Sequence, residues 1–308
     1  MSLRRRLLRR KGTSTSPRTI GTLAVLALAA GALSACTMAL LTGPALAESR
    51  AGCRPPVVSG GFRVPAHTSY VRWDLGSARL NTIEQDLYIA NDPGTEVGLY
   101  VGLVSSEIDG TSFYLGIQTD VKKPGVGGAG KGFIFSRWET LDAADGRVPS
   151  DGFMEQGTHE GRFVGVRRLY QWRAGTQYTL RLARGASDGP ADWYDLTLIE
   201  RPSENEVDLG GLRFPRRDPA RPASIKPQSV TFTEVYSGAT DYAEVPQWRL
   251  ATRSRGDGVP AVSARSEYPA YPFAEYPNTD VTYDEAEDWV HLIYGADTAR
   301  CHPAGALY

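Results

Sequence analysis

Four glutamates occupy positions where a carboxylate could do acid–base chemistry on a sugar. Glycoside hydrolysis needs two carboxyl groups flanking the scissile bond, one protonated and one ionised. Strand alternation would place Phe232 and Glu234 on one face, and Thr233 and Val235 on the other. An aromatic face bearing a carboxylate suits sugar chemistry, although each acid could equally be an ordinary surface residue or an arginine partner. The four candidates are Glu139, Glu155, Glu160 and Glu234.

Six tryptophans could supply flat apolar surfaces for pyranose rings, whose C–H faces pack on aromatic planes. The alternative is a structural role, because large aromatic side chains of a β-sandwich are usually buried. We expect about two of the six to be exposed, given how often Trp is largely buried. The candidates for carbohydrate binding are Trp138, Trp172, Trp193 and Trp248.

A cluster of acids near the C-terminus offers a weak calcium hypothesis. Asp280, Asp284 and Glu285 carry the hard oxygen ligands that Ca²⁺ prefers. We favour the simpler explanation that acids gather at a helix N-terminus, where the helix dipole stabilises them. No cofactor is therefore expected, with Ca²⁺ as the alternative.

Other catalytic signatures are missing from the sequence. It has no G-x-S-x-G, P-loop or H-E-x-x-H pattern, and no G-x-G-x-x-G after a strand. The four histidines are dispersed, at His67, His159, His291 and His302. The carboxylates therefore carry the only enzyme hypothesis that we retain.

The N-terminal segment has the features of an export signal. Its first 47 residues contain seven basic groups and no acid, and an uncharged run extends over 19–47. Cleavage after Ala47 fits the A-x-A rule and predicts a secreted protein. Leu33-Ser34-Ala35-Cys36 instead resembles a lipobox, which would make Cys36 a lipidated N-terminus. The uncleaved run is also long enough to remain as a membrane anchor.

Each of these alternatives places the rest of the chain outside the cytoplasm. Without the seven bases, 27 of the 34 basic residues remain against 35 acids, a net charge of −8. Such an acidic body is a poor partner for nucleic acid.

Two cysteines remain beyond the export segment, Cys53 and Cys301. In an exported protein they would most simply form one disulfide, which would join the two ends of the body. The bond requires Cα atoms about 4.4 to 6.8 Å apart. Two unrelated buried thiols are the alternative.

The rest of the chain reads as an all-β protein. Short runs rich in Tyr, Val, Ile, Phe and Thr alternate with Gly, Pro, Asn and Asp, which is typical of an antiparallel β-sandwich or jelly roll. We predict a linker over 48–56, a sandwich over 57–253 and a C-terminal arm over 254–308 that packs on the sandwich. One short helix is predicted at 284–294, ending at Gly295.

The segment from Ser112 to Trp138 resembles an uncharacterised family of bacterial secreted domains of unknown function. That family pairs a Tyr-Phe-Gly-Ile-Gln strand with an Ile-Leu-Phe-Ser-x-Trp strand, similar to 113–118 and 132–138 here. Its later Glu-Gly and Trp-x-x-Gly-x-x-Tyr segments are similar to 155–161 and 172–178. The resemblance covers roughly 100 to 140 residues. It implies a concanavalin-like sandwich and an association with extracellular polysaccharide.

These observations favour an exported β-sandwich, monomeric, that binds extracellular or cell-wall carbohydrate. One alternative is a glycoside hydrolase-like enzyme that uses two of the glutamates. Another is a structural envelope protein or protein-binding module.

Overall fold

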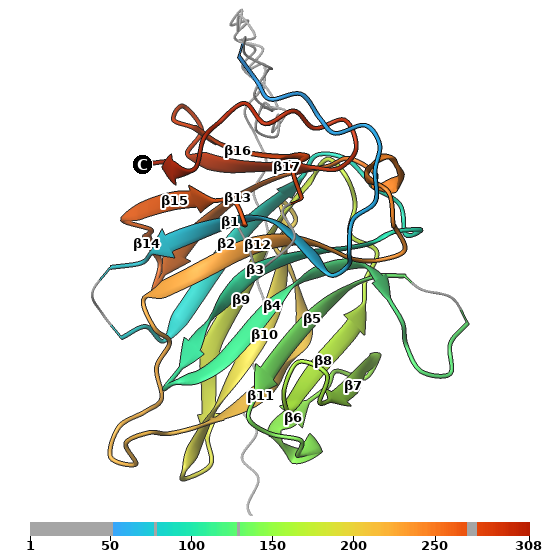
Figure 1. Cartoon of the computed structure of the whole chain (residues 1–308). Coiled ribbons are helices and arrows are strands. Elements are labelled where there is room, and N and C mark those ends of the chain that lie inside the picture. The colour runs from blue at the N-terminus through green and yellow to red at the C-terminus, as the bar shows by residue number, and fades with distance from the viewer. Residues whose placement is uncertain (1–51, 77–78, 128–129, 270–275) are drawn as a thin grey trace, which may run out of the picture. The chain divides into compact units, whose positions relative to one another are not determined.

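The computed structural model describes residues 52–76, 79–127, 130–269 and 276–308 (Figure 1). The predicted export segment, including Cys36, lies outside these residues. Within the described ranges, no helix is both long enough and apolar enough to cross a bilayer.

Two antiparallel sheets make up the fold. The first sheet has the spatial order β18 (Gly305–Ala306), β15 (Ser263–Glu267), β1 (Ala66–Asp74), β12 (Gln228–Ser237), β3 (Gly98–Ile108), β4 (Thr111–Val121), β5 (Gly130–Trp138), β8 (Phe163–Leu169) and β7 (Gly152–Gly157). The second has the order β16 (Thr279–Asp284), β17 (Trp289–Tyr294), β13 (Trp248–Gly256), β2 (Thr82–Ile89), β9 (Thr176–Ser187), β10 (Ala191–Arg201), β11 (Asn205–Pro215) and β6 (Gly146–Arg147). The short β14 (Val259–Pro260) pairs with β13. The predicted all-β sandwich is confirmed.

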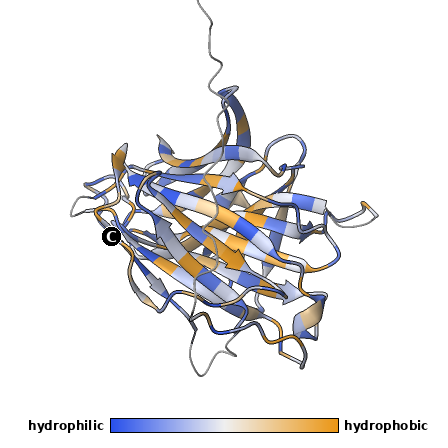
Figure 2. Ribbon diagram, turned by 90° about the horizontal axis from the view of Figure 1, so that it is seen from above, coloured by the Kyte–Doolittle hydropathy of each residue, from blue (hydrophilic) through white to orange (hydrophobic). Residues whose placement is uncertain are grey.

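The core forms from side chains that alternate along the strands. In β12, Thr231, Thr233 and Val235 are buried at 0%, whereas Glu234 is only partly covered. This agrees with the predicted placement of Glu234 on the face opposite to Thr233 and Val235. Figure 2 shows hydrophobic and hydrophilic residues alternating along the strands. Burial of the hydrophobic set between the sheets is the main stabilising contribution.

The predicted helix at 284–294 is wrong. This segment is the end of β16, a turn and then β17, and Asp288 adopts a positive φ of 57° in the turn. Val290, Leu292 and Tyr294 all enter the core, which is the two-residue period of a strand. In the described residues the only helical elements are two 3₁₀ turns, Ala143–Asp145 and Tyr242–Glu244.

The described residues of the segment 254–308, which are 254–269 and 276–308, contribute strands to the two sheets and do not form an arm laid over them. Ser254 continues β13, β15 and β18 extend the first sheet, and β16 and β17 form an edge of the second. A boundary at Arg253 therefore has no counterpart in the strand pairing.

The predicted disulfide between Cys53 and Cys301 is confirmed. Their Cα atoms are 4.1 Å apart, slightly less than the expected range. The neighbouring residues Arg54 and Arg300 exchange backbone hydrogen bonds of 2.8 and 2.9 Å, so two chain segments 248 residues apart are held side by side. A structural disulfide indicates folding in an oxidising environment.

Candidate functional site

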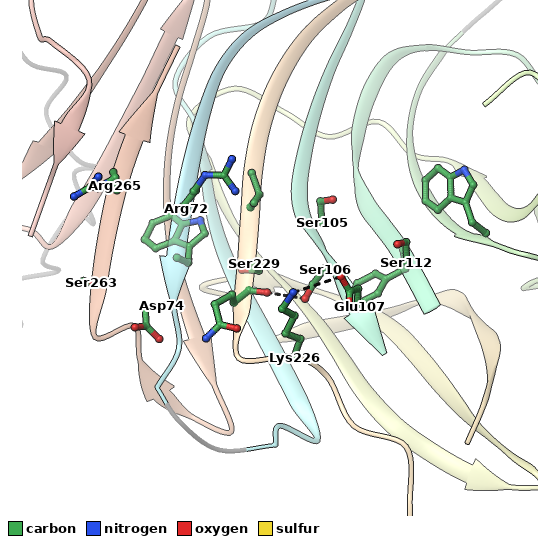
Figure 3. A pocket seen from close by; sticks show the side chains of 15 residues that line it. Arg72, Asp74, Ser105, Ser106, Glu107, Ser112, Lys226, Ser229, Ser263 and Arg265 are labelled. Carbon is green, nitrogen blue, oxygen red and sulfur yellow. Dashed lines mark hydrogen bonds and ion pairs between the residues drawn. The ribbon is translucent and has the colours of Figure 1, made fainter. Parts of the chain in front are cut away.

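A long groove lies on the outer face of the first sheet, across β1, β12, β3 and β4. It consists of two adjoining cavities that share Arg72, Ser105 and Val230. The larger, of about 1120 Å³, is here named the aromatic half; its lining includes His67, Tyr70, Tyr100, Tyr114, Gln118, Glu155, Glu160, Phe163, Arg167, Phe232, Glu234 and Tyr236. The smaller, of about 780 Å³, is the polar half; its lining includes Asp74, Ser106, Glu107, Ser112, Trp138, Lys226, Ser263 and Arg265 (Figure 3).

Strand register aligns the side chains of the aromatic half in rows. Glu234 of β12 lies opposite His67 of β1 on one side and Tyr100 of β3 on the other. Tyr100 in turn lies opposite Gln118 of β4. Side chains directly opposite on one face of a sheet have Cβ atoms about 5 Å apart, so this row spans four strands as a continuous surface.

Glycines give the groove its depth. In the next row, Gly102 of β3 lies opposite Gly116 of β4. A Cβ at position 102 would overlap the ring of Phe232, which reaches across from β12. The aromatic ring therefore lies down over a strand that carries no side chain at that point.

The aromatic rings contact one another along the groove. Tyr100 packs edge-on against Phe232 at 5.2 Å between ring centroids and lies 5.5 Å from Tyr114. Tyr114 continues the row to Trp138 at 4.7 Å. The indole N–H of Trp138 donates to the carbonyl oxygen of Glu160 at 2.9 Å, which ties the ring to the loop that bears Glu160. This packed row links the two halves of the groove.

Glu234 is the carboxyl group most altered by its surroundings. Its side chain is 14% exposed, and Oε1 lies 3.8 Å from Nε2 of His67. Burial, followed by the negative charge of Glu160, raises the pKa of Glu234 to about 7. Burial also lowers the pKa of His67. Near neutral pH, Glu234 can therefore act either as an acid or as a base.

Arg167 of β8 is a buried cation that lines the same cavity as Glu234. Its Nε donates to Glu155 at 2.8 Å and its Nη1 donates to the hydroxyl of Ser136 at 2.9 Å. The guanidinium is thus paired and satisfied by hydrogen bonds, as a buried charge must be. The carboxylate of Glu155, by the same contact, faces a fixed positive charge.

The structure brings three of the four candidate glutamates together. Glu155, Glu160 and Glu234 all line the aromatic half. Glu139 is exposed, sits in a turn with a φ of 70°, and lines neither cavity.

The tryptophans divide into two groups. Trp138 is half-buried and lines the polar half, while Trp193 is half-buried on β10 of the second sheet, with Arg147 over its ring at 5.5 Å. Trp172 and Trp248 are a correction, because they stack on each other inside the core at 5.2 Å and present no free face. Trp73 and Trp289 are also buried.

The acids proposed for Ca²⁺ take part in local hydrogen bonds. Asp280 accepts from the backbone N–H groups of Cys301 and His302 at 3.0 and 2.9 Å. Asp284 accepts from the N–H of Ala286 at 2.9 Å within the turn, and Glu285 is exposed. Over the described ranges, no group of three or more His, Cys, Asp or Glu residues is arranged to hold a metal ion.

Sequence reasoning missed most of the groove lining. The missed residues include His67, Tyr70, Tyr100, Tyr114, Gln118 and Arg167. One available signal was glycine in the interior of strands. The glycines concerned are at positions 102, 116, 132 and 165, within β3, β4, β5 and β8. Glycine in the interior of a strand often marks close approach of another group.

Comparison with known proteins identified no family. No protein-family profile and no curated protein matches the chain. Among solved structures, Scytalido-glutamic peptidase with a peptide-based transition state analogue is 10% identical, with a TM-score of 0.39 over 75% of this chain and 98% of that one. SCP-B, an Eqolisin-family peptidase in complex with the tripeptide Ala-Ile-His, has the same identity and coverage and a TM-score of 0.37. The PL-14 alginate lyase from Aplysia kurodai is 10% identical, with a TM-score of 0.33 over 63% of this chain and 72% of that one. No residue role is taken from these proteins.

Proposed function

We propose that this protein is an exported β-sandwich that binds a polysaccharide chain in the groove on the outer face of its first sheet. The observation that carries the proposal is the row of contacting rings from Phe232 through Tyr100 and Tyr114 to Trp138. Phe232 and Tyr100 are buried and support the row from below, whereas the half-buried Tyr114 and Trp138 present the ring surface that a sugar can reach. Ligand sites are typically concave surfaces lined by aromatic groups with a few polar groups among them. An aromatic row along a groove suits successive sugar rings, whose apolar faces pack on it while their hydroxyls reach polar groups.

The polar groups in the groove support a sugar ligand. Gln118 offers both a donor and acceptors in the row that contains Glu234, and Ser105 stands where the two halves meet. The groove is open along the sheet, so a ligand longer than one ring would fit.

Export is supported by two independent features. The N-terminal segment has a basic stretch followed by an uncharged run. The Cys53–Cys301 disulfide fits an oxidising compartment. Together they support an extracellular or cell-wall polymer as the proposed ligand.

A second candidate function, cleavage of the bound chain, is favoured by the state of Glu234. A carboxyl group with a pKa of about 7 retains its proton near neutral pH and can protonate the leaving oxygen of a glycosidic bond. Glu160 is exposed in the same cavity and would be the second carboxyl group, the one that activates a water molecule. Two carboxyl groups in such different surroundings are what hydrolysis requires.

Direct binding to polysaccharides tests the first proposal. Protein purified with its disulfide intact would be measured by affinity electrophoresis against soluble glucans, xylans, galactans, chitosan and polyuronates. Retarded migration in at least one polymer is expected, and unchanged migration in all of them would contradict the proposal.

Product formation separates binding from cleavage. The conservative substitution Glu234→Gln keeps the size of the side chain but cannot donate a carboxylic acid proton. If the chain is cleaved, E234Q should abolish release of reducing ends while still binding the polymer. Release of reducing ends by E234Q at the unaltered rate would remove Glu234 as the acid.

A further inference from the structure

Two arginines lie directly opposite each other at the edge of the groove. Arg72 of β1 and Arg265 of β15 are register partners, and both side chains are exposed on the outer face of the first sheet. Figure 3 shows them side by side on neighbouring strands in the polar half. Like charges directly opposite on a sheet are destabilising.

The surrounding acids neutralise this pair only in part. Arg72 donates from Nε to Glu267 at 2.7 Å. Arg265 has no carboxylate within ion-pair distance among the described residues. Asp74, which is also in the polar half, accepts from the backbone N–H of Gly76 at 3.0 Å and forms no ion pair with either arginine, so its charge offsets the two cations only in part. The sheet thus holds the unpaired guanidinium of Arg265 beside the cation of Arg72. Their repulsion destabilises the sheet, and a bound anion would relieve it.

A third cation completes the polar half. Lys226, just before β12, lies 3.4 Å from Glu107 of β3, and both side chains are roughly half exposed. An ion pair this exposed is weak, because water and salt screen it. Its ammonium group therefore remains available to a stronger anionic partner.

We propose that the polar half is an anion-binding subsite that selects acidic polysaccharides, those with carboxylate or sulfate groups along the chain. This inference rests on the proposed function, because it assumes that a polysaccharide occupies the groove. Arg265 and Arg72 bind the anionic group through their planar N–H forks, which match carboxylate and sulfate oxygens.

Because of the position of Arg72, a single polysaccharide chain can contact both the subsite and the aromatic row. Arg72 lines both halves of the groove, as do Ser105 and Val230. A sugar ring packed against the aromatic half therefore places its neighbour along the chain beside the two arginines. The rest of the body is acidic, so local cations are needed if a polyanion is to bind at all.

Pairs of polysaccharides with the same or a closely similar sugar backbone and different charge test the inference. The probes are polygalacturonate against its methyl ester, carboxymethylcellulose against hydroxyethylcellulose, and dextran sulfate against dextran. The subsite predicts tighter binding of the acidic member of a pair, and the pairs distinguish carboxylate from sulfate recognition. Arg265→Gln should weaken binding of that member about tenfold, the loss expected for a charge-assisted hydrogen bond, with binding of its neutral partner unchanged.

Arg249→Gln is the matched control, because Arg249 is an exposed arginine on β13 of the second sheet. It should leave all affinities unchanged. Equal affinity for the members of each pair, or an acidic preference that R265Q does not reduce, would overturn the subsite and leave the polysaccharide proposal standing. Failure of the unaltered protein to bind any polymer would contradict the proposed function and the subsite together.

Discussion

Oε1 of Glu234 lies 3.8 Å from Nε2 of His67, across two strands whose residues are 167 positions apart in the sequence. Burial acts on both groups against their charged forms, raising the pKa of Glu234 and lowering that of His67. Near neutral pH the carboxyl group of Glu234 can therefore exchange its proton with solvent. Such titration near the working pH is typical of functional sites.

The raised pKa of Glu234 predicts a pH-dependent stability. Its folded-state pKa of about 7 exceeds the value of 4.5 expected when unfolded, so the stability present below pH 4.5 is lost as the pH rises to about 7. Glu234→Gln removes this loss. Between pH 4.5 and 8, the unfolding free energy of the unaltered protein should fall by about 3 kcal/mol more than that of E234Q.

Urea titrations at several pH values measure this difference. Glu139→Gln is the control, because Glu139 is an exposed glutamate outside the groove. E139Q should follow the pH dependence of the unaltered protein. Parallel curves for E234Q and the unaltered protein would show that burial does not shift the carboxyl group.

The rate of any cleavage reaction should fall in alkaline solution. A general acid acts only while it is protonated, so the rate should fall as the pH rises through about 7. The alkaline limb of a plot of kcat/KM against pH measures the pKa of this acid in the free protein. A rate that stays constant from pH 6 to pH 9 would be incompatible with Glu234 in that role.

Gly116 should not tolerate a side chain. A Cβ there would overlap the carbonyl oxygen of Val101, an atom of the backbone that cannot move aside without shifting β3. Gly116→Ala is expected to destabilise the protein by about 1–3 kcal/mol and to reduce polymer binding.

Gly127→Ala is the matched control for this substitution. A Cβ at position 127 would meet no heavy atom within 4 Å, so its stability and binding should be unchanged. Thermal unfolding of the two variants gives the comparison. A G116A protein as stable as G127A would mean that the two strands are not packed as closely as described.

Reduction of the Cys53–Cys301 disulfide should lower stability substantially. The bond closes a loop of 248 residues, which corresponds to about 5 kcal/mol in the chain-entropy model. The double variant C53S/C301S should unfold at correspondingly lower urea concentration than the oxidised protein. Non-reducing mass spectrometry should find the bridge and no free thiol at these positions, and a midpoint unaffected by the double substitution would refute this contribution.

Local pattern was enough to predict part of the fold. The alternation in β12 correctly separated Phe232 and Glu234 from Thr233 and Val235, because strand periodicity depends only on neighbouring residues. The 284–294 segment failed because acids followed by a short apolar run fit a helix start as well as a hairpin. Its pairing with β13 on one side and β16 on the other makes β17 a strand.

The groove itself depends on contacts that no local pattern encodes. His67 meets Glu234 only through the register of β1 with β12, and that register follows from tertiary packing. Residue type likewise cannot distinguish Trp138, which lies at the groove, from Trp172, which is buried in the core. Both are aromatic residues that fit either role.

Comparison of two tryptophan variants tests the central claim most directly. Trp138 and Trp193 are both half-buried, but only Trp138 lines the groove, whereas Trp193 lies on the second sheet. The dissociation constant for the best-bound polysaccharide should rise at least about tenfold in W138A and stay unchanged in W193A, with both variants folded by near-ultraviolet circular dichroism. Equal affinity of W138A and the unaltered protein, or a loss confined to W193A, would contradict binding in the groove.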